Sequence, residues 1–528
     1  MRGISVNSFR EALEAREKFV ITCELIPGRG FKGKSLDQVI SFATEAKEID
    51  SIHALSLTDN AGGNPALSAD ILAAEIQAAG VDVIAHFSCK DMNRNFIESR
   101  AFALQRTGVS NLLVITGDYP IDGFLGTAKP VFDMDSVSAL HYLTELNRGL
   151  EVQVGRKTAV MEPPNLYLGA CVSPFKWTEG PSKMQYLKME KKIQAGAHYL
   201  ISQLGYDARK YWELIRFARD FLKTDIPIIG SVYILTGGAA RLMNAGEIPG
   251  CYVSDDFRKR VAAEAKADDK GRAARIERAA KQVAMIKGFG FSGAHIEGLN
   301  LKTKDVQAIL SKAAEYESDW ESFIGEFDSV PGKPFYLFEE GAGKSVKEDG
   351  TPLSFTKTKR KTVFSPVFWL TRILHFTIFE PGTLGFKFMT GFTRFIENKK
   401  FFYAMFSWFE RVAKKLLFDC RQCDDCSLFE LFYLCPESKC PKGMRQGPCG
   451  GSRVDGSCEV YEENKCIWDM IYRRAKNRKQ CSKLRFIIAP RDWELYDTNS
   501  WVNYFQKHDH SSKQLNIQEP ASSSVCDE

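Results

Sequence analysis

The chain has 528 residues, of which 44% are hydrophobic and 26% charged, and its formal net charge is +5 at pH 7. This length suits a barrel of roughly 250–300 residues followed by a further module, and the small basic excess does not indicate nucleic-acid binding. The sequence shows no apolar signal-peptide core at its start and no long uncharged apolar run, so we expect neither export nor an integral membrane segment. A cytoplasmic protein is therefore expected, in which clustered cysteines bind metals or redox groups rather than form disulfides.

Eight short β-rich runs alternate with helical stretches over residues 1–315. The runs are FVITCELI (19–26), ALSLT (54–58), VDVIAHF (81–87), NLLVITGD (111–118), LYLGACVS, HYLISQLG, IPIIGSVY and GAHIEGLN. Eight successive βα units predict an α/β fold in which a parallel sheet closes into a (β/α)₈ TIM barrel. The main alternative is an open doubly wound sheet, which would place a glycine-rich phosphate loop after the first strand, where this sequence has none.

Two glycine motifs do not indicate nucleotide binding. GFGFSG (288–293) precedes the last predicted strand, whereas the dinucleotide fingerprint follows a strand and opens a helix. GAGKS (341–345) resembles a P-loop, but Phe338 stands where that motif needs its first glycine.

Polar side chains recur at the ends of the predicted strands. They are Glu24, Thr58, His86, Asp118 and Gln203. Taken singly, each has an ordinary explanation as a turn, cap or structural hydrogen-bonding residue. Because barrel enzymes place their chemistry at the carboxyl ends of the strands, five polar groups on one face favour an active site there.

The second half of the chain divides by composition. Residues 316–362 are expected to form a flexible connector rich in Gly, Lys, Ser and Thr. Residues 363–418 are dense in aromatics mixed with Lys and Arg, and we expect two or three helices there that pack the following module against the barrel or a partner. A membrane-surface helix is the alternative, and nucleic-acid stacking lacks a supporting motif. The tail, residues 506–528, is predicted to be disordered.

A cysteine-rich module is expected over residues 419–505. Its eight cysteines are Cys420, Cys423, Cys426, Cys435, Cys440, Cys449, Cys458 and Cys466. The first three form C-x₂-C-x₂-C, which wraps one cubane in bacterial ferredoxins, and two later cysteines precede proline. Zinc sites usually use C-x₂-C pairs. Two [4Fe–4S] clusters, one cluster with a zinc, or two zincs remain open.

Seven segments of the barrel resemble the methylenetetrahydrofolate reductase family in order and spacing. They are TCELIPGRG, LTDNAGG, AHFSCKD, LLVITGDYP, LKMEKKIQAGAHYLISQLGYD, IPG (248–250) and GAHIEGLN. The resemblance implies a flavin cofactor, FAD or alternatively FMN, and a tetrahydrofolate substrate in one-carbon metabolism and methionine biosynthesis. It makes Glu24 the candidate general acid, with a pKa raised in a partly apolar barrel mouth. Asp118 matches the aspartate beside the flavin's pyrimidine edge.

The same resemblance assigns further pocket residues. Gln203 is implied to bind the pterin, and the residues implied to hold the flavin are Thr58, His86, Cys171, Lys188, Lys191 and Lys192. A solvated helix face is the other interpretation of the three lysines. The sequence departs from the family at Thr116 and Leu301, where basic residues are usual, and at Glu297, where an aromatic is usual.

Residues of about 360–505 resemble a C-terminal companion of these reductases, which is a separate iron–sulfur-linked subunit in acetogens. The combined resemblance implies a reductase that interconverts 5,10-methylene- and 5-methyltetrahydrofolate, with electrons relayed through the cysteine module. Ferredoxin or an iron–sulfur complex is the implied donor, NAD(P)H the alternative, and an oligomer is expected. Two other functions stay open: an electron-transfer adaptor without activity, and a methyltransferase-associated barrel, which the CGG at 449–451 faintly resembles.

Overall fold

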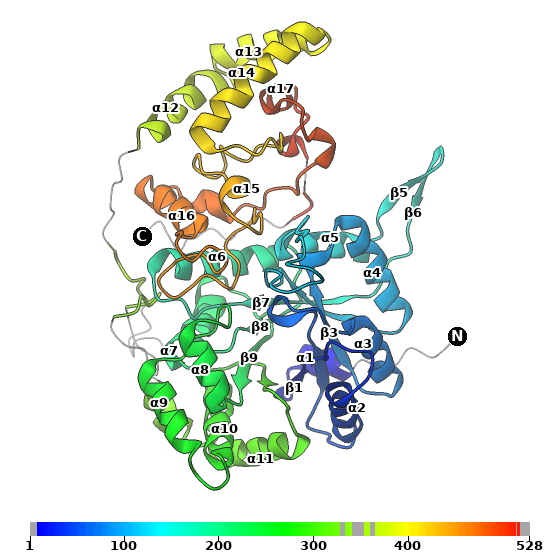
Figure 1. The fold of residues 1–528 in the computed structure, drawn as a ribbon, viewed down its shortest axis with the longest axis vertical. Coiled ribbons are helices and arrows are strands. Elements are labelled where there is room, and N and C mark those ends of the chain that lie inside the picture. The colour runs from blue at the N-terminus through cyan, green and yellow to red at the C-terminus, as the bar shows by residue number, and fades with distance from the viewer. Residues whose placement is uncertain (1–7, 328–332, 340–352, 359–364, 514, 518–528) are drawn as a thin grey trace.

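The computed structural model describes residues 8–327, 333–339, 353–358, 365–513 and 515–517 (Figure 1). Eight parallel strands form a closed barrel in the order β1-β2-β3-β4-β7-β8-β9-β10. Their bounds are β1 Val20–Leu25, β2 Ala54–Leu57, β3 Val83–Ser88, β4 Asn111–Ile115, β7 Tyr167–Val172, β8 Tyr199–Ser202, β9 Ile228–Tyr233 and β10 Gly293–Glu297. The predicted (β/α)₈ barrel is confirmed, and each predicted run contains its strand, except that β3 ends one residue beyond its run, at Ser88.

Helices surround the barrel because each carries an apolar face toward the sheet. They are α2 Lys34–Ala46, α3 Ala69–Ala78, α4 Arg94–Arg106, α5 Ser136–Arg148, α6 Glu179–Gln194, α7 Ala208–Arg216, α8 Gly237–Ala245, α9 Asp255–Glu264, α10 Arg272–Gly288 and α11 Thr303–Glu315. Two elements were not predicted. Helix α1 (Ser8–Ala15) buries Phe9 and Leu13 against the amino ends of the strands, and a hairpin of β5 (Glu151–Val154) and β6 (Lys157–Val160) projects from the barrel (Figure 1).

The inward side chains of the strands change from apolar to polar along the barrel axis. Side chains of a strand alternate between its two faces, so every second residue points inward. On β1 these are Val20, Thr22 and Glu24, and on β10 they are Gly293, His295 and Glu297, which pair in register with β1. Val20 belongs to the apolar cluster that packs on Phe9 of α1, whereas Glu24 lies at the carboxyl end. The sequence thus closes one end of the barrel and leaves polar groups at the other.

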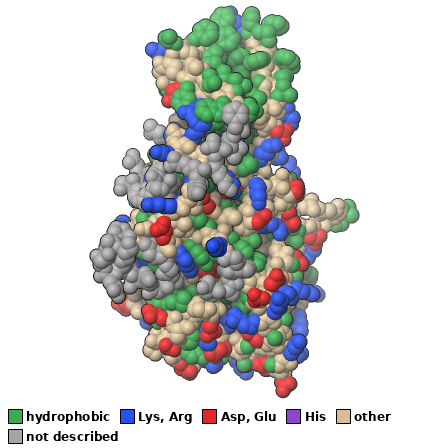
Figure 2. Space-filling view, turned by 90° about the vertical axis from the view of Figure 1, so that its left-hand side faces the viewer, with side chains coloured by type: hydrophobic (Ala, Val, Ile, Leu, Met, Phe, Trp, Pro, Cys, Tyr) green, Lys and Arg blue, Asp and Glu red, His purple; other side chains and the backbone are tan. Residues whose placement is uncertain are grey.

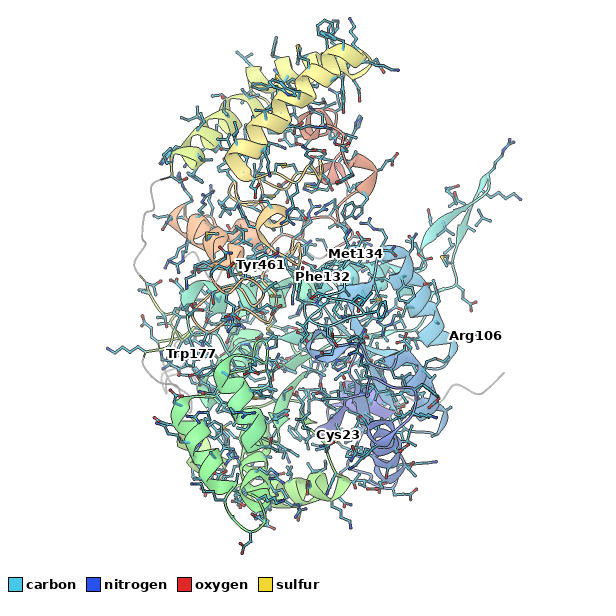
Figure 3. The ribbon with its side chains drawn as sticks, viewed as in Figure 1. Cys23, Arg106, Phe132, Met134, Trp177 and Tyr461 are labelled. Atoms are coloured by element: carbon cyan, nitrogen blue, oxygen red, sulfur yellow. The ribbon has the colours of Figure 1, made fainter. Side chains whose placement is uncertain are left out.

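The C-terminal module is stacked on the carboxyl end of the barrel (Figure 1). Its helices are α12 Pro366–Leu374, α13 Leu384–Glu397, α14 Lys400–Phe418, α15 Pro436–Lys439, α16 Ile467–Asn477 and α17 Ser500–Phe505. Figure 3 places Tyr461, Phe132 and Met134 at the level where the module meets the barrel, and Cys23 farther from the module, among the barrel strands. Helix α16 packs on α6, while α12, α13 and α14 lie at the end of the module that is remote from the barrel. Among the described residues, none of the helices combines the length and the apolarity needed to cross a membrane.

The connector is better ordered than predicted where the structure describes it. Residues 320–327 form a 3₁₀ helix next to α10, and Phe338 and Phe355 are buried and stacked with their ring centroids 5.3 Å apart. Lys210 donates to the carbonyl of Phe335 at 2.6 Å. The expectation of a flexible connector is therefore wrong for these residues, because aromatic side chains anchor them on α7. The GAGKS motif lies outside the described residues.

Two further expectations need correction. The aromatic segment does form helices, but they pack on the far end of the module and not against the barrel. Of the tail that was predicted to be disordered, residues 506–513 pack on the module, and His510 is buried there with its Nδ1 2.5 Å from Oδ1 of Asp425. Residues 518–528, including Cys526, lie outside the described part.

A buried ion pair fastens the module to the barrel. The Nε of Arg485 donates to the two carboxylate oxygens of Glu190 on α6, at 3.1 and 2.9 Å, and both side chains are 5% exposed. Removing one partner of such a pair leaves an uncompensated buried charge, which typically costs about 3–5 kcal/mol.

We therefore expect Arg485→Met to destabilise the docked module and to expose the junction to proteolysis. The measurement is the rate of limited proteolysis together with the thermal unfolding profile. Arg411→Met is the matched control, because Arg411 pairs with Asp497 on an exposed surface. Equal effects of the two substitutions would show that the Arg485–Glu190 pair has no special role in docking.

Candidate active site at the barrel mouth

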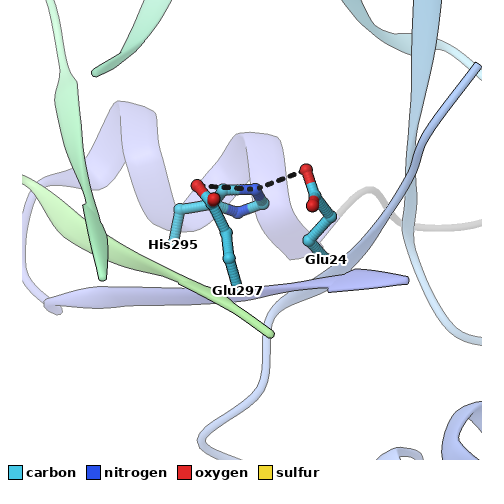
Figure 4. Close-up of side chains that lie close together, drawn as sticks. All are labelled: Glu24, His295 and Glu297. Atoms are coloured by element: carbon cyan, nitrogen blue, oxygen red, sulfur yellow. Dashed lines mark ion pairs between the residues drawn. The ribbon is translucent and has the colours of Figure 1, made fainter. Parts of the chain in front are cut away.

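Two carboxyl groups and one imidazole converge at the carboxyl ends of β1 and β10 (Figure 4). The Nε2 atom of His295 lies 3.8 Å from Oε2 of Glu24 and 3.9 Å from Oε1 of Glu297. On its other side, Nδ1 of His295 is 2.7 Å from Oγ1 of Thr22, which fixes the ring plane. Since Glu24 and Glu297 stand on neighbouring strands and point inward, the barrel brings their charges together around one ring.

Burial and proximity separate the proton affinities of the two carboxyl groups. For Glu297, burial and the nearby charge of Glu24 raise the pKa to about 7. For Glu24, burial also acts upward, but the hydrogen bond and charge of His295, joined at low pH by the charge of His86, outweigh it and lower the pKa. Burial lowers the pKa of His295, yet the two carboxyl groups raise it overall. The expected raised pKa of Glu24 is thus not found; Glu297 is the carboxyl group whose pKa is raised, because two adjacent carboxylates cannot both ionise cheaply.

His86 reaches the same interior from β3. Its Nε2 is 2.8 Å from Oγ of Ser56, and burial lowers its pKa to about 4. The ring is therefore neutral near pH 7. Arg100, which pairs with Asp59 at 2.7 Å, donates to the backbone carbonyl of His86 at 3.1 Å and so fixes the end of β3.

Asp118 lies in a loop that packs tightly on the loop after β2. One carboxylate oxygen of Asp118 accepts a hydrogen bond from the backbone N–H of Gly62 at 2.8 Å. Gly63 has φ +76°, and a Cβ there would stand 2.1 Å from the carbonyl oxygen of Tyr119. Burial raises the pKa of Asp118, while Lys442 of the module lowers it. The glycines of LTDNAGG thus allow the contact that positions Asp118.

A loop of the cysteine module forms a roof over this mouth. The Nζ of Lys442 donates to the carbonyl of Gly117 at 2.8 Å and pairs with the buried carboxylate of Glu459. The Nζ of Lys176, after β7, donates to the carbonyls of Gly450 and Ser452 at 2.5 and 2.7 Å. The backbone between Cys440 and Cys458 therefore rests directly on the strand ends.

A cavity of about 330 Å³ remains between the roof and the loop that joins α8 to α9. Its lining includes Lys176, Gly250, Cys251, Ser452 and Glu459. The IPG segment (248–250) lies here, and a Cβ on Gly250 would meet Gly450 of the roof at 2.7 Å and the side-chain amide of Gln203 at 3.5 Å. Gln203 thus lies beside the roof, at the end of β8.

The three lysines of α6 are buried under the module, which excludes the solvated helix face. Lys188 donates to the carbonyl of Pro448 at 3.1 Å, and Lys192 donates to the carbonyl of Cys171. Burial lowers the pKa of Lys191 to about 7 and that of Lys192 to about 8. Lys188 is therefore engaged by the module, whereas Lys191 and Lys192 lie deeper beneath it.

The eight clustered cysteines separate into two groups of four. In the first group, burial and then the nearby Cys435 raise the pKa of Cys420, and burial followed by neighbours of the same group raises that of Cys423 to about 12. The group lines a small cavity: Cys420, Cys423, Cys426 and Cys435. In the second group, burial and then the nearby Cys449 and Cys458 raise the pKa of Cys440. Burial and then Cys449 and Cys440 raise the pKa of Cys466. All eight thiols are free of disulfide bonds.

Sequence reasoning missed His295 as a site residue and interpreted Glu297 as a change in a loop. The signal was present in GAHIEGLN, because His295 and Glu297 stand two residues apart on a strand and therefore share a face. Lys442 could not have been found this way, since its role depends on how the module docks. The structure places Glu24, His86, Asp118, Cys171 and Gln203 at the carboxyl end of the barrel, and their roles stay predictions.

Comparison with known families agrees with this arrangement. The model of the family described as methylenetetrahydrofolate reductase matches residues 8–314, which is more than half of the chain. The protein belongs to the methylenetetrahydrofolate reductase family. A second model, described as the methylenetetrahydrofolate reductase C terminal, matches residues 402–494, which contain all eight clustered cysteines.

Individual relatives are distant. Methylenetetrahydrofolate reductase 2 of Saccharomyces cerevisiae is 27% identical over 198 residues, which cover 36% of this chain and 30% of the yeast protein, so the match spans less than a third of that relative. A solved protein from Clostridium thermocellum, described as binding two copies of 5-methyl-5,6,7,8-tetrahydrofolic acid, is 14% identical, covers 58% of this chain and 98% of its own, and gives a TM-score of 0.41. A dihydropteroate synthase from Coxiella burnetii in complex with pteroic acid is 11% identical, with coverage of 58% and 95% and a TM-score of 0.32.

The raised pKa of Glu297 predicts a pH-dependent stability. Its folded value of about 7 exceeds the ordinary 4.5, so the stability that protonated Glu297 contributes is present below pH 4.5 and is lost as the pH rises to 7. Glu297→Gln cannot ionise and should not show this loss. We therefore compare the unfolding temperatures of the variant and the parent at pH 4.5 and at pH 7. The variant should gain several degrees relative to the parent between these two pH values, which corresponds to at most about 3 kcal/mol. If the difference in unfolding temperature between the variant and the parent did not change with pH, Glu297 would not be the group that titrates in this range.

Proposed function

We propose that this protein is a flavin-dependent oxidoreductase that interconverts 5,10-methylenetetrahydrofolate and 5-methyltetrahydrofolate. The observation that carries the proposal is the Glu24–His295–Glu297 group, which offers one stored proton at the mouth of a barrel of this family. Ring opening of the methylene substrate requires a proton on a folate nitrogen, and a buried acid group can deliver it near neutral pH.

The residues at the mouth fit a flavin. Thr58 has a buried hydroxyl without a hydrogen-bond partner among the described residues, and it has the inward register at the end of β2. Thr58, His86, Asp118 and Cys171 would hold the ring system. Lys191 and Lys192 would hold its phosphate end, where a bound phosphate favours the charged form of both lysines. We expect FAD, with FMN as the alternative. When bound, a flavin supplies hydride transfer, while the protein positions it and tunes its electronics.

The chain's own groups divide the proton chemistry between them. Glu24 is the general acid at the substrate, and Gln203 orients the pterin from the end of β8. Glu297 holds the proton in the resting site, and the ring of His295 lies between the two carboxyl groups, within 4 Å of both, where it can pass the proton from one to the other. The negative charge of Asp118 would disfavour an anionic form of the neighbouring flavin. The same charge would stabilise the cationic substrate that forms after ring opening.

The cysteine module is proposed to hold two [4Fe–4S] clusters, one in each group of four. The C-x₂-C-x₂-C spacing of Cys420, Cys423 and Cys426 resembles that of bacterial ferredoxins more than the C-x₂-C pairs of zinc sites, and this supports the proposal. Clusters of this kind supply single electrons, and the docking of the second group on the barrel mouth supports reduced ferredoxin or an iron–sulfur complex as the donor.

The first test is Glu24→Gln. The variant should fold, bind flavin and accept electrons, yet lose folate turnover in both directions by about 10²–10⁴-fold, because protonation and its reverse share one group. Rapid-mixing measurements would follow flavin reduction and its reoxidation by methylenetetrahydrofolate separately.

Asp118→Asn is the matched comparison. It should shift the flavin potential and the affinity for folate together while turnover stays measurable, because Asp118 acts through charge and not through proton transfer. If the reduced flavin of Glu24→Gln were reoxidised by the substrate at the parent rate, Glu24 would have no part in the mechanism.

The second test concerns the cysteines. Cys420→Ser and Cys440→Ser should each remove about half of the iron and acid-labile sulfide from anaerobically prepared protein, because each substitution affects one group of four. Cys481→Ser is the control, since Cys481 is fully buried outside both groups. Stoichiometric zinc without iron would contradict the cluster assignment, and electron paramagnetic resonance of the reduced protein would distinguish the two clusters.

A further inference from the structure

Helix α14 buries polar side chains and exposes apolar ones, which is the reverse of an ordinary surface helix. Its buried face is polar: Lys414 pairs with Glu410 at 2.9 Å, and the hydroxyl of Ser407 accepts a hydrogen bond from Asn499 at 3.1 Å. Ser500 of α17 bonds to both Glu410 and Lys414. This buried network fixes the rotation of α14 about its axis, so that the apolar face of the helix must point outward.

The outward face of α14 is a stripe of large apolar side chains. Phe401 is 75% exposed, Trp408 66% and Leu416 81%, and Met405 lies between them at helical spacing. Ordinary surface helices place such a stripe against the core. Here the fully buried residues of the helix are polar, Phe406 packs on Trp501 beside them, and the stripe stays exposed within the described part of the chain.

Helices α12 and α13 extend this stripe into a continuous surface, which we call the apolar cap. Its exposed members are Trp369, Leu370, Ile373, Phe376, Leu384, Phe388, Phe395, Phe401, Phe402, Met405, Trp408, Phe409 and Leu416. Figure 2 shows the hydrophobic side chains gathered at the end of the molecule remote from the barrel, where Figure 1 places α12, α13 and α14. Scattered exposed apolar residues are normal, whereas a contiguous patch marks an interaction site.

The charges around the cap are of one sign. Residues 366–418 contain eight Lys and Arg and three Glu. The three acidic residues are engaged within the protein, because Glu410 pairs with Lys414, Glu397 lies 3.7 Å from His508, and Glu380 lies 3.6 Å from His375.

The basic residues, in contrast, are available. Lys387, Arg394, Lys399 and Lys400 are exposed and form no ion pair within the described part of the chain, and Lys399 lies over the ring of Phe395 at 3.5 Å. The cap therefore combines unpaired cations with aromatic side chains.

We propose that the apolar cap docks on an anionic lipid bilayer, with α13 and α14 lying in the interface. An amphipathic helix with Trp, Phe and Leu on one side and Lys and Arg flanking them buries its apolar side about 5–10 Å into the headgroup region. Anionic lipids complement the basic residues. A second copy of the chain would instead bring two like-charged caps together, which opposes self-association.

The test uses the full-length protein and vesicles of phosphatidylcholine, with and without phosphatidylserine. We expect sedimentation with the phosphatidylserine vesicles, weaker binding at high salt, and a blue shift of tryptophan fluorescence from Trp369 and Trp408. The double variant Phe401→Ser/Trp408→Ser and the charge variant Lys399→Glu/Lys400→Glu should each reduce binding by roughly ten-fold or more. Neither pair belongs to the proposed site, so iron content and circular dichroism should stay unchanged.

Phe124→Ser/Leu125→Ser is the matched control, because both residues are 91% exposed on a barrel loop far from the cap in sequence. It should bind vesicles like the parent. The proposal is overturned if the parent does not sediment with either vesicle, or if the two cap variants bind as well as the control. It is equally overturned if light scattering shows a dimer that Phe401→Ser/Trp408→Ser dissociates, since a second copy would then cover the cap.

Discussion

The architecture depends on buried cations that bridge the barrel and the cysteine module. Lys176 of the barrel donates to two carbonyls of the roof, and Lys442 of the roof donates back to Gly117 of the barrel. A buried ammonium without partners would be very costly, and these carbonyls satisfy it. Since each side supplies groups that the other must satisfy, neither the mouth of the barrel nor the cysteine loop is complete alone.

This closure explains the electrostatics of the mouth. The side chains of Glu24, Glu297 and His295 are only 17%, 10% and 1% exposed, so their charges interact in a poorly screened environment. The surroundings separate the two carboxyl groups: the pKa of Glu297 is raised, whereas that of Glu24 is lowered. Perturbed pairs of this kind are typical of functional sites, because they hold a proton ready where chemistry needs it.

The same principle shapes the distant end of the module. Helix α14 turns its polar side inward because Glu410, Lys414 and Ser500 satisfy one another there. Once that network forms, the aromatic side has no protein surface to cover. At both ends of the module, the hydrogen-bond and ion-pair partners of buried polar groups therefore set the packing. At one end they dock the module on the barrel, and at the other they leave the apolar cap exposed.

The sequence by itself determined the barrel, its eight strands and the presence of polar groups at their ends. Alternating helices and β-rich runs are local signals, and the position of Glu24 at the end of β1 follows from them directly. It also determined that the cysteines form a separate module, because their spacing is local. His295 and Glu297 were readable as a pair on one face of a strand, but their approach to Glu24 required closure of the barrel between β1 and β10.

Only the tertiary structure decided how the cysteines divide into two groups, which loop covers the mouth, and which side of α14 is buried. These outcomes depend on contacts between residues that are far apart in the chain, such as Lys176 with Gly450 and Glu190 with Arg485. Composition predicted a flexible connector, yet its described residues are anchored on the barrel; it predicted helices in the aromatic segment, and these form but pack at the far end of the module. Hydrophobic content alone does not specify a partner: Phe338 found a buried site on the barrel, whereas the stripe of α14 was excluded from the core by the better-satisfied polar face of the same helix.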